Sequence, residues 1–202
     1  VEERVQHLLS VARQSQPHQF ERIRPNGTIL EVRGLPLADG SFVTIYTDVT
    51  EQQHAAEAIE RLAHRDALTG LANRYTLEAR LDQLVADARR HDRCLAVMFL
   101  DMDDFKTVND TLGHDVGDQF LCEVARRLTA TVRDNDIVAR IGGDEFMVVL
   151  AELLDTNDAA VVAAKITESL GQPITLGQHV LRASVSIGVC FHPQDGHDRS
   201  TL

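Results

Sequence analysis

The stretch Gly142-Gly143-Asp144-Glu145-Phe146 lies between two apolar runs, residues 136–141 and 146–150. A Gly-Gly pair in this setting predicts a tight β-hairpin, because glycine tolerates the positive φ angles that such turns require. Without Cβ atoms, the turn would also let a phosphate approach the backbone closely. Asp144 and Glu145 then lie at the hairpin tip, where their hard oxygen atoms suit Mg²⁺. An ordinary acidic hairpin is the alternative.

A second apolar run, residues 95–100, leads directly into Asp101, Met102, Asp103 and Asp104. This pattern is typical of a buried central strand that delivers carboxylates from its C-terminal end. If the strand pairs with the hairpin, Asp101 and Asp144 converge. Two nearby carboxylates repel each other, so a divalent cation between them is expected. The alternative is a solvated acidic loop that follows a core strand.

Apolar residues recur at helical spacing in three further segments, and strands are expected at Leu95, Ile137, Phe146 and Ala183. This order predicts an α/β (α+β) fold with a mixed sheet flanked by helices. His114 and Asp115 are assigned to a loop before the second helix. The helical stripes consist of Leu77, Leu81, Leu84, Val85 and Ala88, of Phe120, Leu121, Val124, Ala125 and Leu128, and of Ala160, Val161, Ala164 and Ile166.

The first fifty residues differ from the rest. Residues 20–24, 29–35 and 42–48 predict three short strands separated by turns, which together make a small antiparallel β segment. Residues 51–64 predict a linker helix whose apolar stripe is Ala55, Ile59, Leu62 and Ala63. This linker is either a short coiled coil or a solvated connector.

Composition limits the function. The chain has 202 residues, no Trp, 44% hydrophobic residues and a formal charge of −11, which argues against nucleic-acid binding. An acidic protein would attract a triphosphate only through a metal and through placed cations such as Lys106, Arg133 and Arg140. Three widely spaced cysteines predict reduced thiols and a cytoplasmic location. No apolar run approaches the ~18 residues of a membrane span, so no membrane contact is expected.

Several separated motifs together resemble the GGDEF-domain diguanylate cyclases, which condense two GTP molecules into cyclic di-GMP. The resemblance covers residues 66–74, 99–106 and 109–118, the hairpin and residues 186–189. It implies a palm-like βααβαβ core over residues 65–202, truncated at its C-terminus because the family continues into a last helix. Residues 1–50 resemble the C-terminal part of a PAS sensor domain. Attached sensory domains or an EAL phosphodiesterase are further partners that the resemblance suggests.

The resemblance also implies the roles of individual residues. Mg²⁺ or Mn²⁺ would be bound by Asp101, the Met102 carbonyl, Asp144 and Glu145, and Asp144 and Glu145 are the candidate catalytic pair. Asn109 and Asp118 match the positions that bind guanine, which suits their acceptor oxygens. The phosphates would lie near Asp104, Phe105, Lys106, Gly142 and Gly143. Without the resemblance, Asn109, Asp110 and Thr111 are ordinary turn and helix-cap residues.

Arg133-x-x-Asp136 matches the family's inhibitory site for cyclic di-GMP. The six strand steps from Asp136 to Gly142 span roughly 20 Å at about 3.3 Å per residue, too far for one pocket to use both. The alternative is a surface arginine with an acidic neighbour. Because one site holds one GTP, catalysis would need a homodimer. The competing functions are a non-catalytic module that binds GTP or cyclic di-GMP, and a piece that relays signals and dimerises.

Overall fold

The computed structural model describes residues 17–38, 40–153 and 155–202. The chain divides into two compact units, the first ending at Glu60 and the second beginning at Arg61. The helix α2 (Thr50–His64) contributes residues to both units. Each unit is described by itself.

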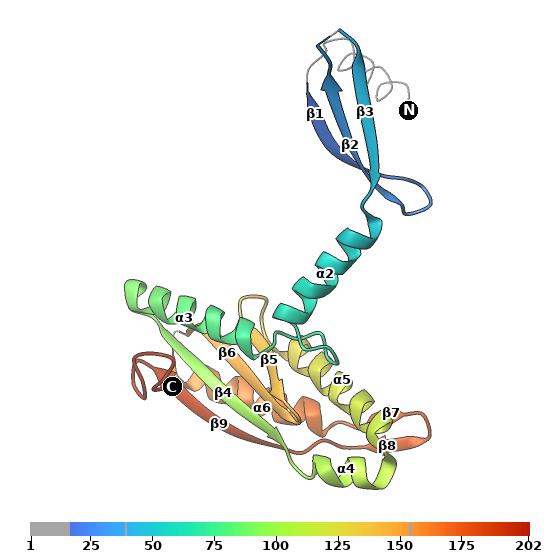
Figure 1. Cartoon of the computed structure of the whole chain (residues 1–202). Helices are drawn as coiled ribbons and strands as arrows, with labels where there is room; N and C mark the ends of the chain where they lie inside the picture. The colour runs from blue at the N-terminus through green and yellow to red at the C-terminus, as the bar shows by residue number, and fades with distance from the viewer. Residues whose placement is uncertain (1–16, 39, 154) are drawn as a thin grey trace. The chain divides into compact units, whose positions relative to one another are not determined.

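The first unit contains an antiparallel meander of β1 (His18–Ile23), β2 (Ile29–Pro36) and β3 (Phe42–Asp48) (Figure 1). The three predicted strands are confirmed. Asp48 begins α2, because its carboxylate accepts hydrogen bonds from the backbone N–H and the hydroxyl of Thr50, at 3.0 and 2.6 Å. Such an acceptor satisfies a backbone donor that a helix N-terminus leaves unpaired.

The second unit is built on a four-stranded sheet with the order β5-β6-β4-β9, and every adjacent pair of strands is antiparallel. The predicted α/β fold is confirmed, and the antiparallel pairing refines the expected mixed sheet, to which a parallel bridge between Ala72 and Ala139 is added. The elements are α3 (Arg74–His91), β4 (Cys94–Met102), α4 (Phe105–Leu112), α5 (His114–Thr131), β5 (Ile137–Gly142), β6 (Glu145–Leu153), α6 (Asn157–Gly171), β7 (Ile174–Leu176), β8 (His179–Leu181) and β9 (Val185–His192).

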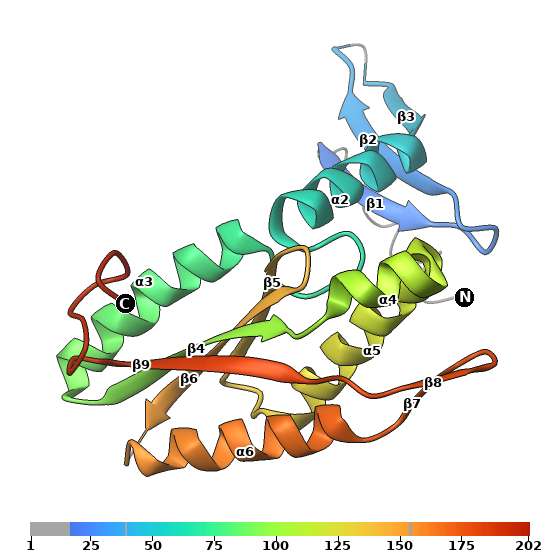
Figure 2. The ribbon, with the colours of Figure 1, turned by 90° about the horizontal axis from the view of Figure 1, so that it is seen from below.

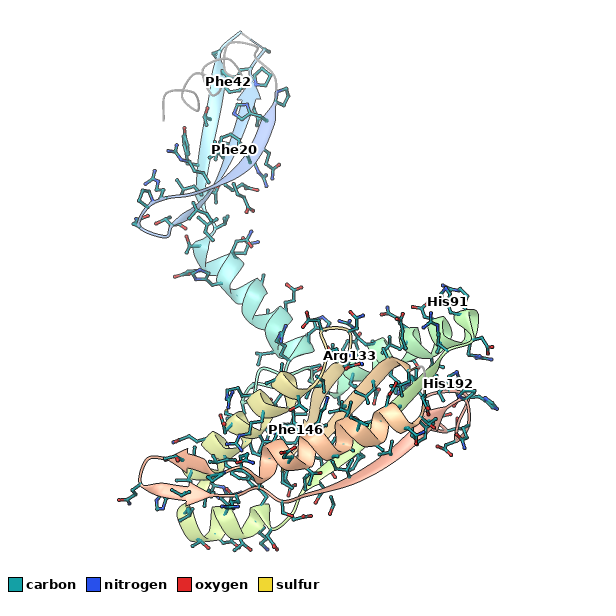
Figure 3. All side chains as sticks on the ribbon, turned by 180° about the vertical axis from the view of Figure 1, so that it is seen from behind. Phe20, Phe42, His91, Arg133, Phe146 and His192 are labelled. Carbon is teal, nitrogen blue, oxygen red and sulfur yellow. The ribbon has the colours of Figure 1, made fainter. Side chains whose placement is uncertain are left out.

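The central strand β4 is buried on both faces from Leu95 to Met98, as its apolar run predicts, but Phe99 within that run is 41% exposed. Ala96, Met98 and Leu100 pack into the main core with side chains of α5 and α6. Leu95 and Val97 alternate to the other face and pack beneath α3. Figure 2 shows α3 on one side of the sheet and α5 and α6 on the other, and Figure 3 shows Phe146 inside the domain. The C-terminal end of β4 extends beyond the helices that cover the sheet, so Asp101 is exposed.

The structure corrects one prediction about helices and decides between two alternatives. The helix α4 was implied only by the βααβαβ core of the resemblance and not by apolar periodicity, and Asn109, Asp110 and Thr111 lie within it, so the alternative that places them in a turn is wrong. Eight residues with few apolar positions are too short to show helical periodicity, and Asn, Asp and Thr are typical of turns. Similarly, His114 and Asp115 form the first turn of α5 and not the preceding loop.

The buried face of α6 also differs from the predicted stripe. Ala159, Ile166 and Leu170 are buried, whereas Val161 is 53% exposed. Residues 159–164 are all Ala or Val, so the spacing of apolar residues cannot show which face of this part of the helix is buried.

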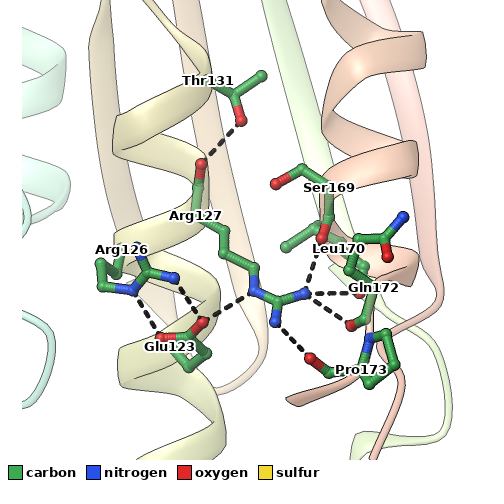
Figure 4. A network of polar contacts seen from close by, with 8 residues as sticks. All are labelled: Glu123, Arg126, Arg127, Thr131, Ser169, Leu170, Gln172 and Pro173. Atoms are coloured by element: carbon green, nitrogen blue, oxygen red, sulfur yellow. Dashed lines mark hydrogen bonds and ion pairs between the residues drawn. The ribbon is translucent and has the colours of Figure 1, made fainter.

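Arg127 of α5 holds the C-terminal end of α6. Its guanidinium donates to the carbonyl oxygens of Ser169, Gln172 and Pro173, each at 2.7 Å (Figure 4). These carbonyls lie in the last helical turn and directly after it, where backbone acceptors lack helical partners. Arg127 and Arg126 both bind Glu123, and the bonds from Arg126 and then Arg127 lower the pKa of Glu123 to about 2, against the opposing effect of burial.

Two connections tie α3 to segments outside it. Asn73 caps its N-terminus by accepting from Thr76 N at 3.0 Å, and its side-chain amide donates to Ala63 O in the last turn of α2 at 2.8 Å. At the other end of the chain, Arg199 bridges to Glu78 and Asp82 on α3. In the described residues no helix is long and apolar enough to cross a membrane.

Candidate active site

The end of β4 and the Gly-Gly turn meet through the pairing of β4 with β6. Asp101 stands opposite Glu145 in this register, and the Met102 N–H donates to the Asp144 carbonyl at 3.3 Å. Directly opposed residues of an antiparallel pair project from the same face of a sheet. The predicted convergence of Asp101 with the hairpin is therefore present in the backbone.

The oxygen donors gathered here fit a hard divalent cation. Asp101 is exposed and Glu145 half-buried, and like charges placed directly opposite each other destabilise a sheet unless a cation relieves them. Asp144 and the Met102 carbonyl add further oxygen donors. Across the described ranges, no three His, Cys, Asp or Glu side chains lie close enough to hold an ion by themselves. Mg²⁺ is usually held by one or two carboxylates together with substrate phosphates, and the facing pair Asp101 and Glu145 can supply such carboxylates.

Arg140 holds the Gly-Gly turn in place. Its Nη2 donates to Gly143 O at 2.7 Å, and its Nη1 donates to Asp66 Oδ1 at 3.0 Å. Gly143 has a φ of 53°, as the predicted turn requires. Partial burial opposes ionisation of Asp66, but hydrogen bonds from Thr69 and Arg140 lower its pKa overall. The expectation that Arg140 attracts a triphosphate is thus corrected, because its side chain is only 11% exposed and its guanidinium is bonded within the domain.

The start of α4 offers backbone donors to an anion. Asp104 precedes the helix with a φ of 58°, and its side chain makes no capping hydrogen bond within the part of the chain that the structure describes. The leading N–H groups of a helix lack helical partners and favour phosphate. Phe105 is buried and anchors the helix, while Lys106 is exposed beside these donors.

Asn109 and Asp118 are brought together by the packing of α4 on α5. Gly117 lies in α5 next to Asp118, and a Cβ at Gly117 would collide with Asn109 Oδ1. The Asn109 side chain therefore occupies the space that the glycine leaves open. Asp118 is exposed, so its carboxylate and the Asn109 amide can face the same ligand.

If Asn109 binds guanine, as the resemblance implies, replacing Gly117 by alanine is expected to weaken GTP binding about tenfold, because the new methyl displaces Asn109 and removes its hydrogen bond. Alanine is favoured over glycine in a helix by about 1 kcal/mol, so the free energy of unfolding should not fall. Calorimetric titration of Ca²⁺-GTP and urea unfolding measure the two effects. Gly171→Ala is the matched control, since no described atom lies within 4 Å of its Cβ position. Unchanged GTP affinity in Gly117→Ala would show that Asn109 does not bind the nucleotide.

Arg133 and Asp136 lie in the turn between α5 and β5, where Figure 3 shows Arg133. Asp136 accepts from the backbone N–H groups of Arg133 and Ala151, at 3.0 and 3.1 Å, so its carboxylate fixes the turn against β6. The Arg133 side chain is exposed. Next to this turn lies a cavity of about 500 Å³ whose lining includes Asp134, Asn135, Arg80 and Arg93.

One cluster beside the site was not predicted. The carboxylate of Asp103 accepts hydrogen bonds from the hydroxyls of Ser184 and Ser186, at 2.5 and 2.7 Å, and these bonds lower its pKa. One pattern in the sequence could have indicated this cluster. Asp101 and Asp103 are two residues apart, and so are Ser184 and Ser186, which is the spacing of side chains on one face of a strand.

The comparison with known families decides the identity of this site. The family described as "Diguanylate cyclase, GGDEF domain" matches residues 63–202, which is more than half of the chain. The chain belongs to the GGDEF family. A PAS fold matches residues 1–58, so a PAS-like region precedes the GGDEF domain. The family resemblance read from the motifs is confirmed.

Individual relatives agree with this assignment. MucR of Pseudomonas aeruginosa, a "bifunctional diguanylate cyclase/cyclic di-GMP phosphodiesterase", is 45% identical over 76% of this chain and 22% of its own length. The solved GGDEF domain of TpbB from the same organism is 41% identical, with a TM-score of 0.67 over 69% of this chain and 81% of that one. DgcB of Caulobacter crescentus, solved with c-di-GMP, is 26% identical, with a TM-score of 0.66 over 76% of this chain and 82% of that one. The chain spans about a fifth of the first curated relatives.

Proposed function

We propose that the GGDEF domain condenses two GTP molecules into cyclic di-GMP and pyrophosphate. The observation that carries this proposal is the pairing of Asp101 with Glu145 beside the Gly-Gly turn. It gathers carboxylates at the end of the two central strands of the sheet, next to a turn and a helix N-terminus that can both receive phosphates. The chain has a net negative charge, so an anionic nucleotide must be held by these local groups and not by the overall charge.

Each residue has a part in this reaction. Asn109 and Asp118 bind the guanine, and the amides of Asp104 and Phe105 with Lys106 hold the phosphates. Gly142 and Gly143 let a phosphate approach, because no described atom lies within 4 Å of either Cβ position. Asp144, with Glu145 beside it, accepts the proton of the attacking 3′-hydroxyl. When bound, Mg²⁺ or Mn²⁺ lowers the pKa of that hydroxyl and neutralises phosphate charge.

The proposed catalyst is a homodimer. The guanine-binding pair and the phosphate-binding turn of one domain are sufficient for one GTP, and the reaction joins two. Two domains must therefore face each other, so that the 3′-hydroxyl on one reaches the α-phosphorus on the other. The rate of product formation should then rise more than linearly with protein concentration.

Incubating the protein with GTP and Mg²⁺ and separating the products by chromatography tests the function. Cyclic di-GMP and pyrophosphate are the expected products. The competing proposal is a non-catalytic module that binds GTP or cyclic di-GMP and regulates an attached EAL phosphodiesterase, a domain pairing that the printed name of MucR favours. Binding of GTP without turnover by the dimeric protein would support that module and exclude the cyclase.

We also propose that Arg133 and Asp136 form an inhibitory site for the product. The exposed Arg133 guanidinium can hold a phosphate or a guanine edge with two parallel hydrogen bonds. The neighbouring cavity supplies space for part of a dinucleotide, with Arg93 and Asp134 in its lining. The solved complex of DgcB with c-di-GMP supports a product-binding role in this family.

The variant Arg133→Ala is expected to lose product inhibition while its initial rate is kept, because Arg133 lies at the opposite end of β5 from the Gly-Gly turn. Loss of a charge-assisted bond should weaken cyclic di-GMP binding by about 1.5 to 3 kcal/mol, or more than about tenfold. Calorimetry with cyclic di-GMP and progress curves at rising product measure both effects. Arg126→Ala, another exposed arginine, is the control. Equal product affinity in Arg133→Ala and the wild type would leave Arg133 a surface residue.

A further inference from the structure

Asp103 occupies the point where the chain leaves the sheet between β4 and α4. The pairing of β4 with β9 ends with Met102 opposite Val185. Beyond it, three hydrogen bonds continue the connection: the Asp103 N–H donates to Ser184 O at 3.0 Å, and the two serine hydroxyls donate to its carboxylate. Both carboxylate oxygens are used, so Asp103, Ser184 and Ser186 form a clamp across the end of the sheet.

The clamp holds a strained part of the backbone. Asp104, the next residue, has a φ of 58°, a left-handed conformation that is unfavourable for a non-glycine residue. Such a conformation persists only where the surroundings hold it in place. On the hairpin side, Met102 is fixed by its bond to Asp144 O, and on the β9 side the clamp fixes Asp103.

The groups on either side of Asp103 are those proposed to contact the nucleotide and its metal. The Met102 carbonyl precedes it, and the amides that open α4 follow it. A tilt of this turn would move the carbonyl and the amides together. The clamp also gives the carboxylates different roles. Asp103 accepts hydrogen bonds from two hydroxyls, while Asp101 and Glu145 remain available to bind a cation.

We infer that Asp103 is a positioning residue, which through Ser184 and Ser186 holds the Met102 carbonyl and the first amides of α4 in the geometry that binds metal-GTP. This inference rests on the proposed function. The strand β9 thereby contributes to nucleotide binding without touching the nucleotide.

The double variant Ser184→Ala/Ser186→Ala tests the inference, because it removes the hydroxyl donors and leaves every proposed contact residue in place. Calorimetric titration of Ca²⁺-GTP should show affinity weakened about tenfold or more. Hydrogen exchange at the amides of residues 103–106 should become faster, while cyclic di-GMP binding at Arg133 should be unchanged. The double variant Ser184→Thr/Ser186→Thr keeps both hydroxyls and should restore affinity and protection.

The control is Ser200→Ala, which removes a bond of the same kind, from the Ser200 hydroxyl to Asp198 at 2.7 Å, in the C-terminal segment. Thermal melts check folding, and the single variant Ser186→Ala replaces the double variant if that one fails to fold. Wild-type GTP affinity and exchange rates in the serine-to-alanine variant would overturn the inference. If the wild-type protein itself does not bind Ca²⁺-GTP, the proposed function fails first, and the inference fails with it.

Discussion

Replacing Asp101 by asparagine is expected to reduce formation of cyclic di-GMP by about 10²- to 10³-fold. The substitution keeps the size of the side chain and removes one negative charge from the place where charge develops in the transition state. Stability should not suffer, because Asp101 is exposed and stands opposite Glu145. Removing one of two opposed carboxylates relieves repulsion across the pair. The melting temperature should therefore be equal to that of the wild type or higher.

Product formation from GTP and Mg²⁺, followed by chromatography, measures this effect at several Mg²⁺ concentrations. Asp158→Asn is the matched control, because Asp158 is an exposed aspartate in the first turn of α6, on a different element of the domain. It should keep the wild-type rate. An Asp101→Asn variant that makes cyclic di-GMP at a near-normal rate would exclude Asp101 as a metal ligand.

Arg127→Met is expected to lower the free energy of unfolding by about 3 kcal/mol. Methionine fills most of the volume of the arginine stem but donates no hydrogen bond. The carbonyls of Ser169, Gln172 and Pro173 lose their shared donor, and Glu123 loses a partner. Arg127 is only 11% exposed, so water cannot fully replace these bonds. Breaking one partner of such a network costs about 3 to 5 kcal/mol when it is buried.

Urea unfolding followed by circular dichroism gives this quantity. Arg126→Met is the natural control, because Arg126 pairs with the same Glu123 but is 66% exposed. Exposed ion pairs contribute about 0 to 1 kcal/mol, so this variant should unfold almost as the wild type does. Equal losses from the two variants would mean that the carbonyl contacts of Arg127 add nothing to stability.

The parts of the fold that were predicted are those with strong local patterns. The apolar run before Asp101 is typical of a buried strand, and the Gly-Gly pair between apolar segments is typical of a tight turn. If the strand pairs with the hairpin, Asp101 approaches the turn, and the structure supplies the pairing and its register. The carboxylate part of the candidate site could therefore be located from sequence, while the role of each residue stays a prediction.

The parts that were missed depend on partners far away in the chain. Arg140 is hydrogen-bonded to Asp66, which is 74 residues away in the sequence, and Asp103 is hydrogen-bonded to Ser184, which is 81 residues away. Nothing local in the sequence distinguishes an arginine that binds a phosphate from one that binds a carboxylate and a turn. The short helix α4 was implied only by the family resemblance, since its eight residues are too few for apolar periodicity to appear.

Asn73 joins the last turn of α2 to α3, and Arg140 joins the turn that lies between these helices to Gly143. The route from the end of α2 to the Gly-Gly turn thus consists of a few hydrogen bonds, with Asp66 in the middle. Thermodynamic linkage makes such a connection symmetrical. If a displacement of the α2 end changes nucleotide affinity by some factor, a bound nucleotide must shift the equilibrium position of that helix end by the same factor. The same hydrogen bonds would therefore carry an effect in both directions, from the end of α2 to the Gly-Gly turn and from the turn to the end of α2.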